Sequence, residues 1–175
     1  MFNLQPTLQN EIVRIQPLLL TDFEILYSIA SDPLLWEQHP NKDRYKKEVF
    51  ENFFKGAIES EGAFLVIDNR LNIPIGTSRF YDIDSSNNAI TIGYTFLSRN
   101  YWGGPYNKAL KTLMINHAFT EFSKVFFHIG AKNIRSQKSI ERLGAKKINE
   151  IEVAYYGEPV KLNFVYQIEK GIWHI

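Results

Sequence analysis

The feature that most constrains the fold is a strand, a glycine turn, a helix and a second strand that follow one another between residues 89 and 131. The segments "AITIGYTFL" (89–97) and "KVFFHIGA" (124–131) have the composition of strands, and the second is apolar enough to be buried. Between them, residues 105–122 carry apolar side chains at helical spacing. Because a strand–helix–strand unit joins parallel neighbours through a right-handed crossover, we expect these two strands to be parallel.

Segments on either side extend this unit into a larger sheet. Two strand-like segments before residue 89 are joined to it by short turns, which predicts an antiparallel meander. The predicted architecture is an α/β fold with a mixed sheet, in the order βααβββαβαββ, within one domain over residues 1–175. The expected strands lie at 11–18, 62–69, 73–84, 89–97, 124–131, 146–156 and 159–170, the last two joined around Gly157 and Glu158, and the expected helices begin near Thr21 and span 46–59, 105–122 and 133–144.

Apolar side chains at helical spacing identify the faces that these helices bury. The segment around Pro33 and Pro40 interrupts the pattern and is expected to be a loop or short helical turns. We expect His117, on the apolar face of the long helix, to be structural. The expected buried faces are Ile25, Leu26 and Ile29 in the first helix, Val49, Phe50, Phe53, Phe54 and Ala57 in the second, and Leu110, Leu113, Met114, His117 and Ala118 in the third.

Composition excludes several classes of protein. The chain has 20 basic and 19 acidic residues without a basic stripe, so nucleic-acid binding is not expected. Cysteine is absent, which rules out disulfides, thiolate metal sites and a cysteine nucleophile, and fits a cytoplasmic protein. The four histidines lack the spacing of metal ligands, so no metal is expected. The N-terminal segment carries Glu11 and Arg14 without a long apolar run, which predicts neither a signal peptide nor a membrane span.

The turn before the long helix, "WGGPYN" (102–107), has the composition of an anion site. The first turn of a helix presents unpaired N–H groups and the positive end of the helix dipole. Gly103 and Gly104 would let a phosphate approach the backbone closely, and Pro105 suits the first helical position. The spacing is that of neither a P-loop nor a dinucleotide fingerprint. The pattern alone is compatible with two interpretations, a phosphate site or a turn that contains glycine for steric reasons only.

Two segments resemble the Gcn5-related N-acetyltransferase (GNAT) superfamily. The segments "IGYTFLSRNYWGGPYNKALKTLMINHAF" (92–119) and "NIRSQKSIERLGAKKI" (133–148) are similar to its subgroup of ribosomal-protein amino-terminal acetyltransferases. The predicted order of elements matches throughout, and the likeness is weakest over the first sixty residues. The resemblance implies the GNAT fold, with acetyl-CoA as co-substrate and no metal.

Carried over position by position, the resemblance implies most of a coenzyme A site. The pantetheine arm would pair as an added strand with the free backbone edge at Phe96 and Leu97. A backbone N–H at this edge would also stabilise the oxyanion of the reaction. The diphosphate loop falls on Trp102, Gly103, Gly104, Pro105, Tyr106 and Asn107, the pantetheine-binding strand end on Phe96 and Leu97, and the second motif on Asn133 and Ser136.

Three positions depart from the family pattern. Pro105 stands where relatives carry the second loop glycine, so one backbone donor is lost. Asn107 replaces a small residue, and its amide either donates to the diphosphate or ties down the first helical turn. Relatives with a tyrosine general acid on the second motif helix place it where this chain has Ile140. That role therefore falls elsewhere or is absent.

Three side chains are candidates for the chemistry of acetyl transfer, which needs a neutral amine, a stabilised oxyanion and a proton for the thiolate. His128 and His39 are candidate bases, although a histidine that only supports its strand or loop is the commoner situation. Ser136 is the candidate for contact near the thiol, with helix packing or capping as the alternative. Asn133 is expected to cap its helix, which is compatible with contact to the pantetheine amide.

The acceptor is expected beside the same strands. Trp36, Tyr81 and Tyr94 are candidates to line its pocket, and Arg79 would recognise a carboxylate unless it lies on a solvated sheet face. The resemblance implies direct transfer of an acetyl group from acetyl-CoA to a primary amine of a protein N-terminus, an amino acid or a small metabolite. The alternatives are a non-catalytic acyl-CoA-binding or interaction module on the same fold, and an enzyme for another acyl donor. A homodimer is compatible with the sequence.

Overall fold

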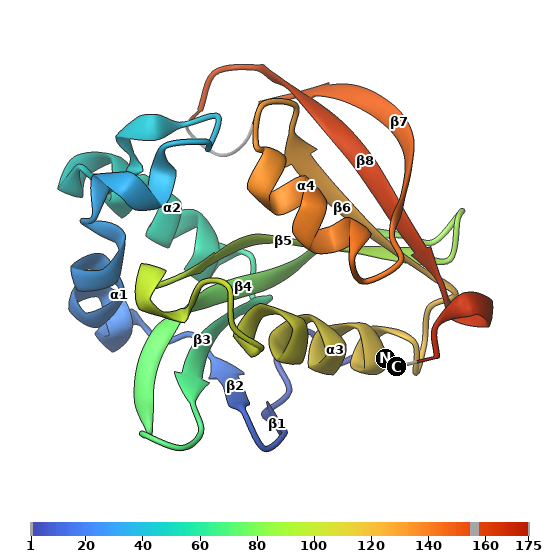
Figure 1. The fold of residues 1–175 in the computed structure, drawn as a ribbon, viewed down its shortest axis with the longest axis horizontal. Helices are drawn as coiled ribbons and strands as arrows, with labels where there is room; N and C mark the ends of the chain where they lie inside the picture. The colour runs from blue at the N-terminus through green and yellow to red at the C-terminus, as the bar shows by residue number, and fades with distance from the viewer. Residues whose placement is uncertain (1, 155–157, 175) are drawn as a thin grey trace.

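The computed structural model describes residues 2–154 and 158–174, which form a mixed sheet with helices on both faces (Figure 1). The strand order across the sheet is β1-β2-β3-β4-β5-β6-β8-β7. The strands are β1 (Leu8–Gln9), β2 (Val13–Pro17), β3 (Ala63–Asp68), β4 (Ile73–Asp84), β5 (Ala89–Leu97), β6 (Lys124–Gly130), β7 (Lys146–Val153) and β8 (Lys161–Glu169). The α-helices are α1 (Phe23–Ala30), α2 (Lys47–Glu59), α3 (Tyr106–Ala118) and α4 (Ile134–Glu141), and the short 3-10 turns include η2 (Pro33–Trp36) and η3 (Lys42–Tyr45).

The predicted order of elements is confirmed, with the short strand β1 added before it. The predicted meander is β3, β4 and β5, which pair antiparallel. The strands β5 and β6 are parallel neighbours, and α3 connects them. The strands β7 and β8 pair antiparallel as predicted, whereas Gly157 of the predicted turn lies outside the described residues.

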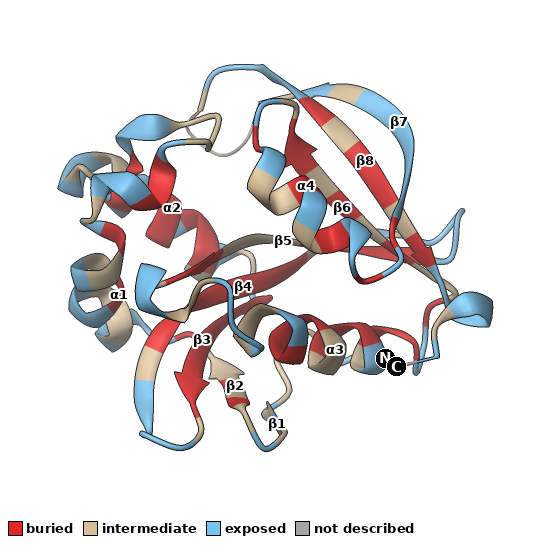
Figure 2. Cartoon of the chain, viewed as in Figure 1, coloured by how far each residue is buried: buried red, intermediate tan, exposed pale blue. Residues whose placement is uncertain are grey.

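The sheet separates two hydrophobic cores (Figure 2). We call the side covered by α3 and α4 the α3 face, and the side covered by α1 and α2 the α2 face. Successive residues of β3 divide between the two faces, as expected for a strand buried on both sides. The α3 face includes Phe64, Val66, Leu110, Met114 and Ile115, and the α2 face includes Leu26, Phe50, Phe54, Leu65 and Ile67.

Two of the predicted buried faces are wrong in part. In α1, Ile25 is 42% exposed, and Leu26 and Ala30 are the buried residues. In α3, the buried face is turned by one position from the prediction, so that Lys111 is buried and His117 lies at its edge. The helical spacing of apolar residues fits two neighbouring faces of this helix almost equally well. The charged Lys111 on the correct face made the other face the expected one.

The strand β6 is less buried than predicted. Its odd-numbered residues, among them Phe127 and Ile129, are buried on the α3 face. Phe126 and His128, which alternate with them, are only half-buried. One side of this strand therefore remains accessible where a ligand could reach it.

A bulge in β5 changes which of its side chains face α3. Residues 77–79 of β4 lie opposite residues 93–96 of β5, so β5 has one extra residue over this stretch. Tyr94, within it, takes a φ of 51°. Ile92 before the bulge and Leu97 after it both lie on the α3 face, although odd and even positions of an unbroken strand would face opposite ways.

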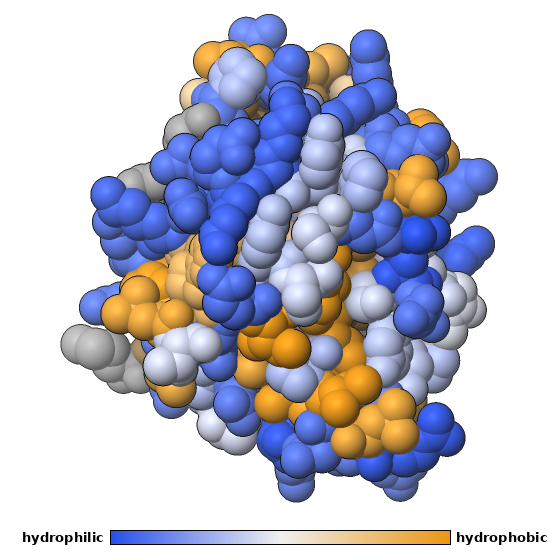
Figure 3. Space-filling view, turned by 90° about the vertical axis from the view of Figure 1, so that its left-hand side faces the viewer, coloured by the Kyte–Doolittle hydropathy of each residue, from blue (hydrophilic) through white to orange (hydrophobic). Residues whose placement is uncertain are grey.

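The side of the molecule formed by α1 and α2 carries apolar side chains on its surface (Figure 3). Exposed apolar patches often mark contacts with other proteins. The homodimer stays a prediction. The exposed apolar residues on and beside α1 are Leu19, Leu20, Ile25 and Leu34.

Within residues 2–154 and 158–174, no helix combines the length and the apolar character needed to cross a bilayer. Nor do three or more His, Asp or Glu side chains of this part of the chain gather as a metal site would require.

Candidate active site

A cavity of about 470 Å³ opens where β5 and β6 separate. The two strands pair only between residues 89–91 and 124–126, and beyond these residues they diverge. The N-terminal ends of α3 and α4 and the loop around Pro40 contribute to its wall. The cavity therefore lies at the carboxyl ends of two parallel strands, where α/β folds commonly bind ligands.

Nearly all of the residues predicted from the sequence meet in this cavity. Tyr106 is the exception, because its hydroxyl donates to Asp68 Oδ2 of β3 at 3.1 Å and its side chain is not part of the wall. Its backbone N–H still belongs to the first turn of α3. The predicted residues that line the cavity are His39, Phe96, Leu97, Trp102, Gly103, Gly104, His128, Asn133, Ser136 and Asn107.

The loop before α3 has the geometry of an anion site. Gly103 takes a φ of 72°, a region that favours glycine, and a Cβ added there would meet no atom within 4 Å. In the described part of the chain, no protein acceptor takes the backbone N–H of residues 103–104 or 106–108. The 13-residue helix α3 directs the positive end of its dipole toward this loop. The open space at Gly103, the free backbone N–H groups and the positive end of the helix dipole therefore fit a diphosphate.

The charged side chains in the described part of the cavity wall are all cationic, and no Asp or Glu lies among them. Arg135 stacks on the indole of Trp102, with 3.7 Å from its guanidinium carbon to the ring centre. A wall of one sign concentrates ligands of the opposite charge. The cationic residues of the wall are Arg44, Lys108, Lys111, Arg135 and Arg142.

Beyond residue 91, no described strand pairs with the edge of β5 that faces the cavity. The indole Nε1 of Trp102 donates to the carbonyl oxygen of Leu97 at 3.0 Å. A carbonyl oxygen has two lone pairs, so this bond leaves one acceptor position on Leu97. The edge meets the requirement for the predicted pairing of an extended arm with Phe96 and Leu97.

A hydrogen bond joins α3 to α4 beside the cavity. The side-chain amide of Asn107 donates to Ser139 Oγ at 2.7 Å, a tie to the neighbouring helix that neither reading of the sequence anticipated. Asn133 caps α4 as predicted, because its side-chain oxygen accepts from the backbone N–H of Ser136 at 3.2 Å. Both helix N-termini are thus held at one side of the same space.

His128 projects from β6 toward the α2 face. Its ring packs edge-on against Tyr81, with 6.1 Å between the ring centres, and no described residue forms a hydrogen bond with its nitrogens. Burial lowers the pKa of His128, an effect that Asp82 partly opposes. The imidazole is therefore neutral at pH 7 and has a nitrogen free to accept a proton.

His39 is tied to its own loop. Its Nδ1 lies 2.9 Å from the backbone nitrogen of Asn41 and 3.1 Å from the carbonyl oxygen of the same residue. The tautomer of the ring decides whether Nδ1 accepts from the N–H or donates to the oxygen. Burial, and then the charge of Arg44, hold the pKa of His39 well below its ordinary value. Nδ1 therefore contacts its own loop, and Nε2 is the ring nitrogen left for a ligand.

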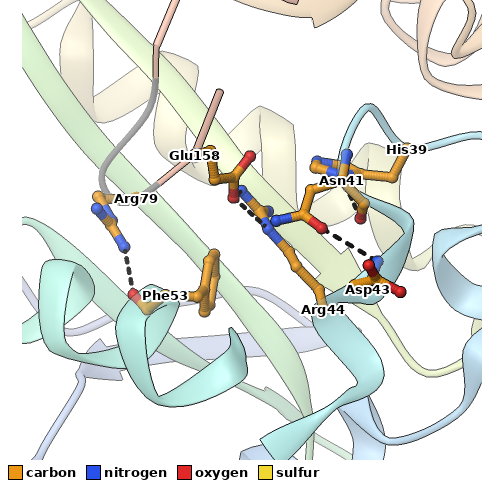
Figure 4. Close-up of polar contacts among 7 residues, drawn as sticks. All are labelled: His39, Asn41, Asp43, Arg44, Phe53, Arg79 and Glu158. Carbon is orange, nitrogen blue, oxygen red and sulfur yellow. Dashed lines mark hydrogen bonds and ion pairs between the residues drawn. The ribbon is translucent and has the colours of Figure 1, made fainter. Parts of the chain in front are cut away.

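Arg44 lies at the centre of a buried cluster that the sequence did not reveal (Figure 4). It is 3% exposed, and its Nε donates to Glu158 Oε1 at 2.8 Å. Its guanidinium also stacks over Phe53 of α2, 4.8 Å from the ring centre. Arg44 and Glu158 are 114 residues apart in the chain, so no local pattern links them.

Arg79 is a second buried cation on the same face. It is 4% exposed, so it does not lie on a solvated sheet face. Its guanidinium stacks on Tyr94 at 4.0 Å and donates to the carbonyl oxygen of Phe53 at 3.4 Å, while its Nε has no partner among the described residues. Burial lowers the pKa of Arg79 to about 10, although Tyr94 opposes the effect. Arg79 is still charged at pH 7.

Lys111 reaches the cavity from the opposite face. Its Nζ lies 2.5 Å from Thr95 Oγ1 and 3.3 Å from Ser78 Oγ, and the residue is 3% exposed. Burial lowers the pKa of Lys111 to about 7. The sequence analysis missed this residue. Its position four residues after Asn107 and four before Ile115, both on the inner side of α3, was the available indication.

Comparisons with known proteins agree with this arrangement. A family model described as "Acetyltransferase (GNAT) domain" matches residues 13–146. No curated protein matches the sequence. A GCN5-related N-acetyltransferase from Brucella melitensis has a similar structure, with a TM-score of 0.82 and 17% identity, over 97% of this chain and 80% of that chain.

Two further similar structures contain coenzyme A or a derivative. Mycobacterium smegmatis RimJ in complex with CoA-disulfide has a TM-score of 0.70 and 14% identity, over 91% of this chain and 82% of that one. Spermidine N-acetyltransferase from Vibrio cholerae, in complex with CoA and spermine, has a TM-score of 0.70 and 13% identity, over 94% and 99%. At these low sequence identities, the similar structures show a shared fold and no more. The family model, in contrast, spans most of the sequence. The chain therefore belongs to the GNAT acetyltransferases, enzymes that acetylate amines with acetyl-CoA.

Proposed function

We propose that this enzyme acetylates a primary amine whose remaining groups are uncharged or acidic, by direct transfer from acetyl-CoA bound between β5 and β6. The observation that carries this proposal is the sign of the cavity wall, where the described residues supply cations and no carboxylate. Such a wall favours the phosphates of coenzyme A and disfavours a polycationic acceptor. An amino acid or a protein N-terminus fits this description, and a polyamine does not.

For the donor, we assign the diphosphate to the backbone N–H groups at Gly103 and Gly104 and to the first turn of α3. Lys108 and Arg142, which line the same cavity, provide opposite charge. The pantetheine arm extends along the open edge of β5, with Asn133 and Ser136 beside it. When bound, acetyl-CoA supplies the activated acetyl group.

For the acceptor, we assign the α2 face of the divergent strands. His128 takes a proton from the incoming ammonium, since it is neutral at pH 7 and its nitrogens have no described partner. Arg79 forms no ion pair with a described carboxylate, and its positive charge near this side suits a carboxylate on the acceptor. Direct attack within a ternary complex needs no enzyme nucleophile, and positioning supplies much of the acceleration.

Binding and turnover test the proposal in sequence. Calorimetry with acetyl-CoA should give saturable binding, and no binding at millimolar concentration would remove the donor assignment. Release of free thiol should then be followed with amino acids, with short peptides bearing a free N-terminus and with spermidine. We expect release with an amino acid or a peptide and little with spermidine. Faster release with spermidine would overturn the acceptor class, and binding without release for any amine would contradict the proposed catalysis.

A further inference from the structure

We propose that Lys111 is the general acid that gives a proton to the sulfur of coenzyme A when the acetyl group leaves it. This inference rests on the function proposed above. It assigns a role to a residue of α3 that is not among the coenzyme A positions implied by the family resemblance.

The position of Lys111 within the cavity is the first argument. Its side chain passes from α3 to the place where β5 and β6 separate, with Thr95 of β5 on one side and Phe127 of β6 on the other. An arm that begins at the α3 N-terminus and runs inward along β5 carries its sulfur toward the inner end of the cavity, where the strands meet. Lys111 is among the residues that line this cavity, beside Thr95 and Phe127.

The bulge in β5 is part of this arrangement. Without the extra residue, Thr95 would face α2, because side chains alternate along a strand. With it, the Thr95 hydroxyl faces α3 and lies 2.7 Å from the hydroxyl of Ser78. The two hydroxyls together hold the Lys111 amine at a fixed position.

The partners of Lys111 are the second argument. The groups that face its Nζ are Ser78 from β4, Thr95 from β5 and the Phe127 ring from β6, whose centre is 5.8 Å away. No described carboxylate pairs with it, and burial is the one cause that lowers its pKa to about 7. Hydroxyls accept a hydrogen bond from the ammonium without neutralising its charge, so this amine can both hold and release a proton near neutral pH.

The direction of proton transfer follows from acidity. A thiol ionises near pH 8.5 and a lysine-like amine near 10.4. The Lys111 ammonium, whose pKa burial lowers to about 7, gives its proton to a thiolate downhill. His128 is available for the acceptor on the opposite face of the sheet. The two titratable groups therefore divide the acid and base roles.

The α4 side of the cavity cannot provide this proton through Ile140. The family resemblance implies a tyrosine acid at this position in some relatives, and in this chain it is a buried isoleucine in the cavity wall. Lys111 lines the same cavity and has an ionisable side chain, whereas the side chain of Ile140 cannot donate a proton.

The complete step balances. The acceptor ammonium loses one proton to His128, and its nitrogen forms a bond to the thioester carbonyl carbon. The C–S bond then breaks, its electron pair stays on sulfur, and Lys111 protonates that sulfur. The new amide nitrogen loses a second proton to water. His128 returns its proton to solvent and Lys111 regains one, so each turnover releases one proton in total.

The test uses the full-length protein and coenzyme A and needs no acceptor. The ionisation of the bound thiol is followed by the ultraviolet absorbance of its thiolate, in the wild type and in Lys111→Met. A neighbouring ammonium should lower the pH of thiol ionisation by up to about one pH unit relative to the variant, because a larger shift would make the thiol a stronger acid than Lys111. The matched control is Lys55→Met on the exposed side of α2, which should behave as the wild type. Equal ionisation in the wild type and Lys111→Met would overturn the inference.

The same titration separates this inference from the proposed function. Loss of coenzyme A binding by the wild type would refute the proposed site, whereas normal binding with an unshifted thiol would refute only the role of Lys111. If Lys111→Met does not fold, Lys111→Gln replaces it, with the same expected difference. With any amine that the enzyme acetylates, kcat should fall about 10²-fold or more in the variant, and the alkaline decline of kcat/KM should disappear. A decline that persists in the variant would also overturn the inference.

Discussion

Both faces of the sheet beside the cavity bury cations, and the charges of Arg44 and Lys111 are balanced differently. On the α2 face, Arg44 forms an ion pair with Glu158. On the α3 face, Lys111 is held by the hydroxyls of Ser78 and Thr95. A carboxylate partner stabilises a charge, whereas hydroxyls leave the cost of burying it in place. We infer that Arg44 supports the structure and that Lys111 takes part in proton transfer.

The chemistry of the two side chains agrees with this division. A guanidinium does not lose its proton in proteins, so Arg44 contributes a fixed charge. A lysine amine changes its protonation readily when buried, and burial lowers the pKa of Lys111 to about 7. Substitution of Arg44 should therefore mainly change stability, whereas substitution of Lys111 should change the dependence of stability on pH.

The largest expected effect is loss of stability in Arg44→Met. Removing the arginine leaves the Glu158 carboxylate, whose side chain is 8% exposed, without its partner. We expect the free energy of unfolding to fall by about 3 to 5 kcal/mol, measured by urea denaturation. The double variant with Glu158→Gln should recover much of this loss, because no unpaired charge then remains.

The surface pair Arg99–Asp32 provides a matched control for this experiment. Its side chains are 41% and 33% exposed, so Arg99→Met should cost about 1 kcal/mol or less. If Arg44→Met were no more destabilising than Arg99→Met, the assignment of Arg44 as a structural ion pair would be wrong.

The next effect is a pH dependence that Lys111 imposes on stability. Its pKa falls from 10.5 in the unfolded chain to about 7 in the folded one, so between these values the unfolded chain binds one proton more. Stability of the wild type should therefore rise with pH relative to Lys111→Met, by at most about 1.4 kcal/mol per pH unit between pH 7 and pH 10. Urea denaturation of both proteins across this range measures the difference. A constant difference would show that Lys111 is not desolvated.

A third effect concerns the anion site. Gly103→Val forces a branched residue into a φ of 72° and places its side chain in the open space of the loop. We expect coenzyme A affinity to fall about tenfold or more, measured by calorimetry. Gly144→Val is the matched control, because Gly144 has a φ of 91°, similar open space and no part in the cavity wall. Equal losses of affinity in both variants would contradict the placement of the diphosphate.

The smallest effect is expected at the tie between α3 and α4. Ser139→Ala removes the acceptor of the Asn107 amide, which at present lies 2.7 Å away. A single hydrogen bond of this kind contributes about 1 kcal/mol, so thermal unfolding should move down by a few degrees. Tighter coenzyme A binding in this variant would indicate that the freed Asn107 amide reaches the diphosphate.

The donor side of the site was predictable because its determinants are local. Its residues lie in two short segments, one with Gly103, Gly104 and the start of α3, the other with the cap at Asn133. In both segments the predicted contacts come mainly from backbone groups. The order of the elements followed from periodicity and turn residues in the same way. The parallel pairing of β5 and β6 then located the cavity.

The surroundings of the buried cations Arg44 and Lys111 could not be predicted because they depend on distant contacts. Arg44 and Glu158 are 114 residues apart in the chain, and the folded structure brings them into contact. Thr95 faces Lys111 because of one extra residue in β5, and strand alternation alone assigns it to the other face. The buried position of Lys111 was hidden because a lysine in a helix is ordinarily assigned to solvent.

The most direct test of the proposed site is a crystal structure of the enzyme with coenzyme A bound. The assignment predicts the diphosphate at the backbone N–H groups of Gly103 and Gly104 and the first turn of α3, with the pantetheine arm along the open edge of β5 and the sulfur within reach of Lys111. A nucleotide bound elsewhere on the molecule, or an arm that leaves the edge of β5 unpaired, would contradict it.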